Sequence, residues 1–195
     1  MMSLKIRMAT AFVAMAILTA CSSLDVNEYA DRGPILDPKT FFEGQLCADG
    51  VVRSRSGEQI RQFQARILAS WDEHGVGTLD EIFEFDDGVE TRIWTLIPEQ
   101  DGVYRASASD VPKATQLRYA GNAIHMNYVL RYGEPGDTID LTMDDWMFLV
   151  SPGVVVNETV MSKWGIRVGQ VLLVIRQVAD DETCISQAAI AQASQ

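Results

Sequence analysis

Most of the chain alternates apolar and polar residues with a period of two. Ile124, Met126 and Tyr128 would share one face of an extended segment, and His125 would lie on the other. Such alternation is typical of a β-strand with one buried and one solvated face. After Phe41 no long stretch repeats with the helical period of about 3.6 residues. The pattern therefore predicts a protein built from strands.

The expected strands are separated by short segments rich in Gly, Asp, Asn and Pro. They are 44–54, 59–71, 78–85, 89–97, 103–109, 114–119, 123–132, 138–150, 154–163 and 166–178. Turn signals at intervals of about ten residues are typical of a sandwich or a barrel. Consecutive antiparallel strands joined by tight turns form an up-and-down layout, which closes readily and leaves no exposed edge. We therefore predict an all-β fold over residues 41–178, an antiparallel up-and-down barrel of about 8–10 strands.

The beginning of the chain has the order of a secretory signal. A short basic start precedes an apolar run over residues 9–18. That run is shorter than the roughly 20 residues that a membrane-spanning helix needs. The tetrapeptide Leu18-Thr19-Ala20-Cys21 resembles the bacterial lipobox, in which cleavage precedes a cysteine that receives acyl chains. We predict a signal peptide over residues 1–20 and lipidation of Cys21, with a chance cysteine at an ordinary cleavage site as the alternative.

The segments on either side of the expected barrel differ from it in composition. Residues 21–40 form the lipidated cysteine and a polar, turn-rich stretch that we interpret as a tether. Its residues 22–38 reach at most roughly 55 Å when extended. Residues 179–195 are rich in Ala, Gln and Ser, which predicts a loose tail or a short terminal helix.

The charge of the chain is strongly negative. The whole chain carries a formal charge of −11, and because residues 1–20 hold two basic and no acidic residues, the mature chain is at −13. This balance argues against nucleic-acid binding, since no Lys/Arg cluster is present to neutralise phosphates. A basic patch for anionic lipid is also missing from the sequence, so attachment to the membrane would depend on the acyl chains alone.

Two cysteines remain besides Cys21. Cys47 lies in the first expected strand and Cys184 follows the last, and a closed barrel brings these strands together. One outcome is a disulfide, as expected in an oxidising compartment, and the other is an unpaired Cys184 in a mobile tail. With only His74 and His125 and no CxxC spacing, we expect no metal site and no cofactor.

Motifs of common enzyme classes are missing from the sequence. It contains no G-x-S-x-G elbow, no P-loop and no dinucleotide-binding fingerprint. With two histidines, no Ser/His/Asp order stands out. These absences weaken an enzymatic function without excluding carboxylate chemistry.

Several motifs occur in an order that resembles a known family. They are Gly77-Thr78-Leu79-Asp80-Glu81 after Trp71, Phe85-Asp86-Asp87-Gly88, Arg92-Ile93-Trp94-Thr95-Leu96, Asp144-Asp145-Trp146-Met147 and Met161-Ser162-Lys163-Trp164-Gly165-Ile166-Arg167-Val168-Gly169. This set resembles the bacterial lipoprotein family catalogued as domain of unknown function 3833, from the lipobox to about residue 176. One departure is Trp164, where the family usually has Phe.

The resemblance implies an envelope lipoprotein with a lipocalin-like barrel and no assigned catalytic residue. Ser22, rather than Asp, follows the cysteine. In the usual sorting rule this residue directs a lipoprotein to the outer membrane, so we expect the domain to lie in the periplasm.

Asp145 is the first candidate for a ligand-binding group. It has the parity of Met143 and Met147, so it is expected to point inward, whereas Asp144 is expected on the surface. A buried carboxylate must be paired or protonated. The arginines that could pair with it are Arg92, Arg118 and Arg167. Such a pair would either hold a ligand headgroup or close the barrel as a structural ion pair.

Further inward-facing side chains would line an apolar pocket. The tentative contact residues are Trp94, Trp146, Met126, Tyr128 and Met143. Glu81 and Glu158 also alternate with apolar neighbours, without identified partners. The function expected from this pattern is binding of a small hydrophobic ligand, such as a fatty acid or a lipid fragment.

Two other functions remain alternatives. The first is a scaffold or interaction lipoprotein with a filled core and no ligand. The second is an enzyme that uses carboxylates at the barrel end. A cavity large enough for a ligand would favour binding over the scaffold, and convergent carboxylates in that cavity would favour the enzyme.

Overall fold

The computed structural model describes residues 24–134 and 136–195. The expected signal peptide and Cys21 lie outside the described residues. The strands are β1 (Gly44–Ser54), β2 (Gln59–Trp71), β3 (Gly77–Phe85), β4 (Gly88–Gln100), β5 (Val103–Ser107), β6 (Thr115–Ala120), β7 (Ala123–Glu134), β8 (Asp137–Ser151), β9 (Val154–Lys163) and β10 (Ile166–Gln177). The helices are η1 (Val26–Tyr29), α2 (Pro38–Phe41) and α3 (Gln187–Ala193).

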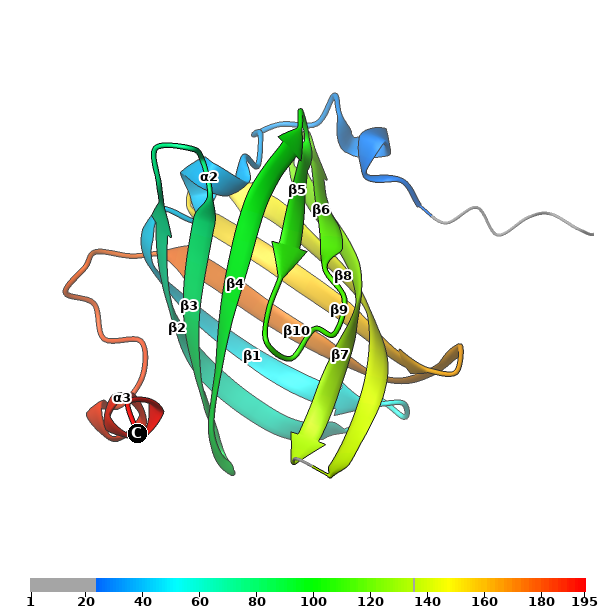
Figure 1. Cartoon of the computed structure of the whole chain (residues 1–195), viewed down its shortest axis with the longest axis vertical. Helices are drawn as coiled ribbons and strands as arrows, with labels where there is room; N and C mark the ends of the chain where they lie inside the picture. Colours follow the sequence, from blue (N-terminus) through cyan, green and yellow to red (C-terminus); the bar gives the residue numbers. More distant parts are fainter. Residues whose placement is uncertain (1–23, 135) are drawn as a thin grey trace, which may run out of the picture.

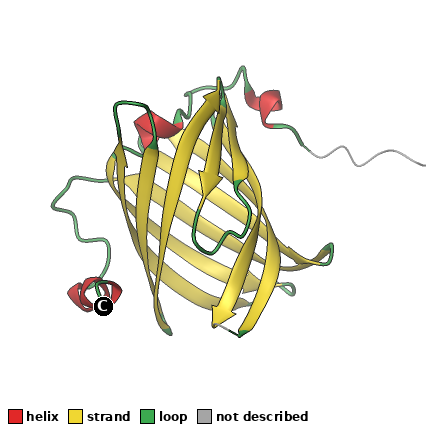
Figure 2. Ribbon diagram, viewed as in Figure 1, coloured by secondary structure: helices red, strands yellow, loops and turns green. Residues whose placement is uncertain are grey.

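The strands form one closed barrel (Figures 1 and 2). Each strand pairs with its neighbours in the sequence, and β1 pairs with β10 antiparallel to complete the ring. The prediction of an antiparallel up-and-down barrel is therefore confirmed. Tight turns hold the strands in register, and closure satisfies the backbone groups that an open sheet would leave at its edges.

The period-two pattern sorts side chains between the inside and the outside of the barrel. On β1, Leu46 and Ala48 are buried, whereas Asp49 is exposed. Gly50 is required by packing, because a Cβ atom at this position would lie 2.4 Å from the Phe63 ring on β2. The absence of a side chain lets this ring lie against the wall of the barrel.

One end of the barrel, called here the closed end, is covered by the segment before β1 (Figure 1). Leu36 is completely buried, and Phe41 and Phe42 are 4% and 3% exposed. The Nε1–H of Trp71 donates a hydrogen bond to the carbonyl of Phe42 at 3.0 Å. Asp37 caps α2 by accepting from the backbone N–H of Thr40 at 2.8 Å.

The described part of the segment interpreted as a tether packs onto the barrel. η1 contacts β6 and β7, and Val26 is 3% exposed. The backbone N–H of Leu36 donates to the carbonyl of Gly121 at 2.8 Å, and Tyr29 lies so close that a Cβ atom on Gly121 would overlap its carbonyl. The segment packs because its few apolar side chains can cover an otherwise exposed barrel end.

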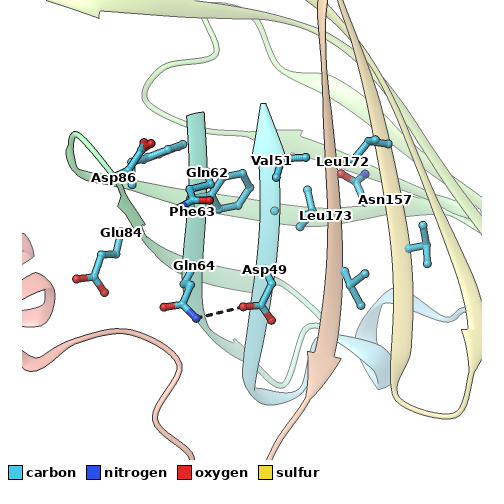
Figure 3. Close-up of a pocket in the computed structure, with 14 residues that line it drawn as sticks. Asp49, Val51, Gln62, Phe63, Gln64, Glu84, Asp86, Asn157, Leu172 and Leu173 are labelled. Carbon is cyan, nitrogen blue, oxygen red and sulfur yellow. Dashed lines mark hydrogen bonds between the residues drawn. The ribbon is translucent and has the colours of Figure 1, made fainter. Parts of the chain in front are cut away.

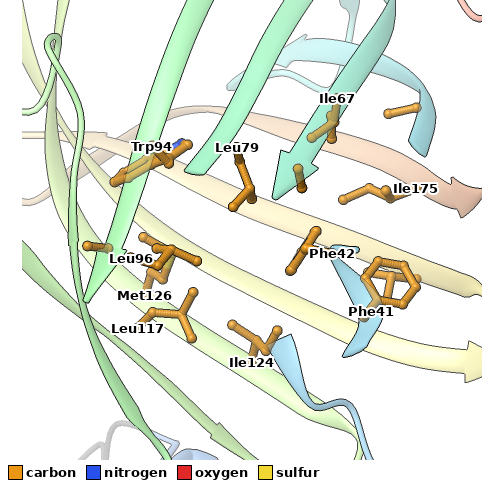
Figure 4. Packing of buried hydrophobic residues seen from close by; sticks show 14 of the residues in the cluster. Phe41, Phe42, Ile67, Leu79, Trp94, Leu96, Leu117, Ile124, Met126 and Ile175 are labelled. Carbon is orange, nitrogen blue, oxygen red and sulfur yellow. The ribbon is translucent and has the colours of Figure 1, made fainter. Parts of the chain in front are cut away.

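Figure 4 shows part of the buried apolar core near the closed end. The side chains drawn there include Ile67, Leu79, Trp94, Leu96, Leu117, Ile124, Met126 and Ile175. Leu96 is 1% exposed and Ile124 is completely buried. This half of the barrel is filled by its own side chains, as expected for a close-packed core.

The C-terminal segment is attached to the outside of the barrel. A disulfide joins Cys47 on β1 to Cys184, with the two Cα atoms 5.2 Å apart. After it, α3 lies against the outer face of β3, where Ala189 packs with Ile82. Ser186 caps α3 and donates from its hydroxyl to Glu84 at 2.6 Å. Of the two forms predicted for this segment, the short helix is present.

Among residues 24–134 and 136–195, none of the helices has the length and apolar character needed to cross a bilayer.

Candidate functional site

A layer of polar side chains crosses the interior halfway along the barrel. Its members share inward parity on their strands and are surrounded by apolar residues. They are Glu81 on β3, Arg92 on β4, Tyr128 on β7, Asp145 on β8, and Asn157 and Thr159 on β9. Polar groups buried this deeply need hydrogen-bond partners or a shift in protonation. We call this set the polar layer.

Asp145 points inward, as its parity predicts, and is 7% exposed. Its Oδ1 accepts a hydrogen bond from the Thr159 hydroxyl at 3.0 Å and another from the side-chain amide of Asn157. Burial raises the pKa of Asp145, and these two bonds and the charge of Arg92 oppose the rise only in part. The Asp145 carboxyl is therefore satisfied mainly by neutral donors on β9.

The predicted ion pair of Asp145 with an arginine is wrong. Arg92 instead donates from Nε to Asp110 at 2.7 Å, in the loop between β5 and β6. Arg118 and Arg167 hydrogen-bond to Gln116 and Gln170, respectively. Asp144 is partly exposed and lies 2.7 Å from Nε2 of His125 on the outer face, which agrees with its expected surface position.

Arg92 keeps its charge although it is held inside the barrel wall. Burial acts to lower its pKa, but the nearby Tyr128, Glu81 and Asp110 act in the opposite direction and raise it. The guanidinium is therefore a permanent cation whose nearest anion is Asp110.

Glu81 is the member of the polar layer with the fewest partners. It is 9% exposed, and its carboxyl makes no hydrogen bond or ion pair with any residue in the described ranges. It stands opposite Arg92 in the β3–β4 register, but Arg92 donates to Asp110 instead. Burial raises the pKa of Glu81 to about 7, an effect that Arg92 opposes and that Asp110 and Asp145 reinforce. Buried carboxyls with raised pKa values are more frequent at functional sites than elsewhere.

Most of the predicted contact residues lie inside the barrel. Trp94 packs edge to face on Tyr128 of the polar layer, with ring centroids 5.3 Å apart. Met126 and Met143 are each 4% exposed and point inward. The prediction for Trp146 is wrong, because this residue neighbours the inward-facing Asp145 and therefore points outward.

Trp146 belongs to an outer aromatic cluster. Its ring stacks on His125 with centroids 4.2 Å apart and on Phe148 with centroids 5.9 Å apart. The ring of Tyr29 from η1 packs on those of Trp146 and Phe148, with centroids 5.7 and 5.4 Å apart. The cluster attaches the N-terminal segment to the barrel wall.

The half of the barrel away from α2 contains inward-facing apolar side chains that are only partly buried. They include Val52, Phe83, Phe85, Met161, Val171 and Leu173. We call this half the mouth half. Other apolar residues of this half, such as Leu130 and Leu141, are buried. Solvent therefore reaches some, but not all, of the apolar side chains that face the interior here.

A pocket of about 760 Å³ lies along the wall formed by β1, β2, β9 and β10 and is open to solvent, and most of its lining residues point outward (Figure 3). The inward-facing part of its lining includes Phe63, Asn157 and Leu173, which come from β2, β9 and β10. The outward-facing part includes Gln64 and Asp49, which are joined by a hydrogen bond of 3.2 Å. The volume lies within the range of about 300–1,000 Å³ that is common for small-molecule sites.

Arg61 spans the mouth itself. Its guanidinium lies 3.5 Å from the centroid of the Phe85 ring and donates to Tyr132 Oη at 3.2 Å. It also forms ion pairs with Asp87 and Glu90. The interaction joins β2 to the β3–β4 hairpin and to β7. Sequence reasoning missed it, although the parity of Arg61 with the inward-facing Phe63 was a usable signal.

Sequence reasoning also missed Asn157 and Thr159 as partners of Asp145. Both share the parity of the buried Val155, which was the available signal. Glu158, singled out by its apolar neighbours, lies on the outer face and accepts a hydrogen bond from Gln170 at 2.6 Å.

Two solved structures share the barrel fold. A protein of unknown function from the DUF3598 family of Nostoc punctiforme matches with a TM-score of 0.54 and 14% identity, covering 75% of this chain and 51% of that protein. The chain thus spans about half the length of the Nostoc protein. The S-type phycobiliprotein lyase CPES from Guillardia theta matches with a TM-score of 0.51 and 8% identity, covering 72% of this chain and 90% of the lyase. At these identities the likeness concerns the fold alone.

Among curated proteins, no sequence matches the chain. A family model does match, over residues 15–177, which is most of the sequence and includes every strand of the barrel. This match agrees with the motifs around Glu81, Arg92 and Asp145. The chain belongs to the family of proteins of unknown function DUF3833.

Proposed function

We propose that this protein binds a small hydrophobic ligand, such as a lipid fragment, in the mouth half of its barrel. The observation that carries the proposal is the partial exposure of inward-facing apolar side chains in this half. Phe83, Phe85 and Leu173 remain partly exposed although they point inward. A barrel that served only as a scaffold has no reason to leave apolar side chains accessible from within.

The apolar lining supports ligand binding energetically. The inward-facing Phe63, Phe85 and Leu173 that border the pocket offer an apolar surface for a medium-length alkyl chain. Burial of ~10 methylene groups at about 0.8 kcal/mol each is sufficient for roughly micromolar affinity. The polar layer would then lie at the inner end of the chain, where a ligand's polar group is expected.

We further propose that the protein is an outer-membrane lipoprotein anchored through Cys21. Val26 at the start of η1 is buried, and four residues, 22–25, lie between it and Cys21. The five steps from Cys21 to Val26 span at most roughly 17 Å. The anchor would therefore hold the barrel close to the bilayer.

Binding is tested with N-phenyl-1-naphthylamine, a neutral fluorophore that brightens in apolar sites. The protein would be residues 22–195, exported to a periplasm so that the disulfide forms. This form retains every element that the structure describes. We expect saturable binding together with quenching of tryptophan emission, because Trp94 lines the interior. Fluorescence that rises without saturation would contradict the proposal and favour the scaffold.

Two variants test whether the fluorophore binds inside the barrel or on its outer surface. Leu173→Trp adds bulk to the inward-facing lining of the mouth half, and Val129→Trp adds the same ring to the outer face of β7, away from the pocket. We expect the first variant to weaken binding of the fluorophore at least tenfold and the second to leave it within about twofold. Equal effects would place the fluorophore on the outside of the barrel.

A further inference from the structure

The charges inside the barrel are unequal in sign. The polar layer and the loop that pairs with it contain three carboxyls, those of Glu81, Asp110 and Asp145, against the single guanidinium of Arg92. A buried carboxylate is normally balanced by an opposite charge or neutralised by protonation. The interior therefore has a deficit of positive charge.

The hydrogen-bond partners place this deficit at one residue. Asp110 has Arg92 at 2.7 Å, and Asp145 has Asn157 and Thr159. Glu81 has no such partner among the described residues, although its side chain is more than nine-tenths buried. Both carboxyl oxygens of Glu81 keep some solvent-accessible surface, so they border space inside the barrel.

The neighbours of Glu81 show which side of the strand this space is on. Leu79 and Phe83 flank it with the same inward parity, whereas Ile82 points outward beneath α3. Phe83 belongs to the partly accessible apolar lining of the mouth half. A ligand whose chain lies against Phe83 would bring its end group to the Glu81 carboxyl.

We propose that Glu81 is the receptor for a protonated amino group, so that the barrel selects amphiphilic amines over free fatty acids. The inference rests on the proposed function and assigns the chemistry of the ligand. An alkylammonium group supplies the missing positive charge and up to three hydrogen-bond donors. A fatty-acid carboxylate would add a fourth acid beside a polar layer whose guanidinium, that of Arg92, already pairs with Asp110.

Binding of the amine depends on the charge of Glu81. The charged or titratable groups that act on this carboxyl are Arg92 on β4, Asp110 in the β5–β6 loop, Tyr128 on β7, Asp145 on β8 and Asp80 on its own strand. Since the pKa of the empty site is about 7, the carboxyl must lose its proton to pair with the amine at lower pH. Affinity for the amine should rise about tenfold per pH unit up to pH 7 and level off above it.

The experiment is displacement of N-phenyl-1-naphthylamine by three ligands with the same chain: dodecylamine, dodecanol and dodecanoate. At pH 8 we expect dodecylamine to compete at least tenfold better than dodecanoate, with dodecanol between them. In Glu81→Gln we expect dodecylamine to weaken at least tenfold and to lose its pH dependence, while dodecanol changes little. Circular dichroism confirms that each variant is folded.

A matched control is the neighbouring acid on the outer face of the same strand. Asp80→Asn removes the same charge without entering the interior, and it should leave the order of the three ligands unchanged. If the fluorophore binds but dodecanoate competes as well as dodecylamine, the assignment of Glu81 is wrong and the proposed function stands. If the fluorophore does not bind, the proposed function itself fails.

Discussion

The stability of the barrel should depend on pH through Glu81. In the unfolded chain this carboxyl has an ordinary pKa of 4.5, and in the folded barrel burial raises the pKa to about 7. Between these two values the folded state holds a proton that the unfolded state has lost. Stability must therefore fall as pH rises through this window, and the full stability is present below pH 4.5.

The magnitude follows from the separation of the two pKa values. Each pH unit between them is worth about 1.4 kcal/mol, so ionisation of Glu81 should reduce the free energy of unfolding by about 3 kcal/mol at pH 8. This is a large share of the 5–15 kcal/mol that is typical of a folded domain. Glu81→Gln removes the titration and keeps the size of the side chain.

The assay is urea unfolding of the wild type and Glu81→Gln at several pH values from 4.5 to 8, followed by tryptophan fluorescence. We expect the difference in unfolding free energy to grow in favour of the variant by about 3 kcal/mol and to become flat above pH 7. Asp80→Asn controls for the change in net charge. A difference between wild type and Glu81→Gln that stays constant over this range would show that the carboxyl is hydrated in the folded protein, and would refute the reasoning.

Three further perturbations test other parts of the molecule. Cys21→Ser should release the protein from the membrane fraction, and retention after a high-salt wash would contradict lipid anchoring. The double variant Cys47→Ala/Cys184→Ala opens a loop of 137 residues and should lower the free energy of unfolding by about 2–5 kcal/mol, seen as a lower urea midpoint; an unchanged midpoint would mean that the crosslink does not constrain the chain. Gly50→Ala places a Cβ atom 2.4 Å from the Phe63 ring and should cost about 1–3 kcal/mol of stability and weaken fluorophore binding. Normal stability would show that this ring moves freely.

The strands and their order could be predicted because their signals are local. The alternation of Ile124, His125 and Met126 follows from backbone geometry, which turns successive side chains to opposite faces of a strand wherever the strand lies. The same rule predicts that Asp145 points inward. Applied to the next residue, the same rule places Trp146 outside. Trp146 was nonetheless predicted as a contact residue because it is aromatic.

Other features depended on which strands closure brings together. Asp145 accepts hydrogen bonds from Asn157 and Thr159 because β8 pairs with β9 in one particular register, and Arg92 meets Asp110 because the loop between β5 and β6 lies beside β4. No local pattern contains these distances, since they arise from the register and circumference of the whole ring.

The ends of the barrel also show which features are encoded locally and which depend on the tertiary structure. The sequence by itself determined that strands, tight turns and an acidic surface would be present, because each is encoded over a few residues. Only the tertiary structure decided that Leu36 would seal one end, that Arg61 would span the other, and that Glu81 would have no hydrogen-bond partner among the residues that the structure describes. An apolar or charged side chain acquires its role from what lies across the barrel, and closure alone brings those groups together.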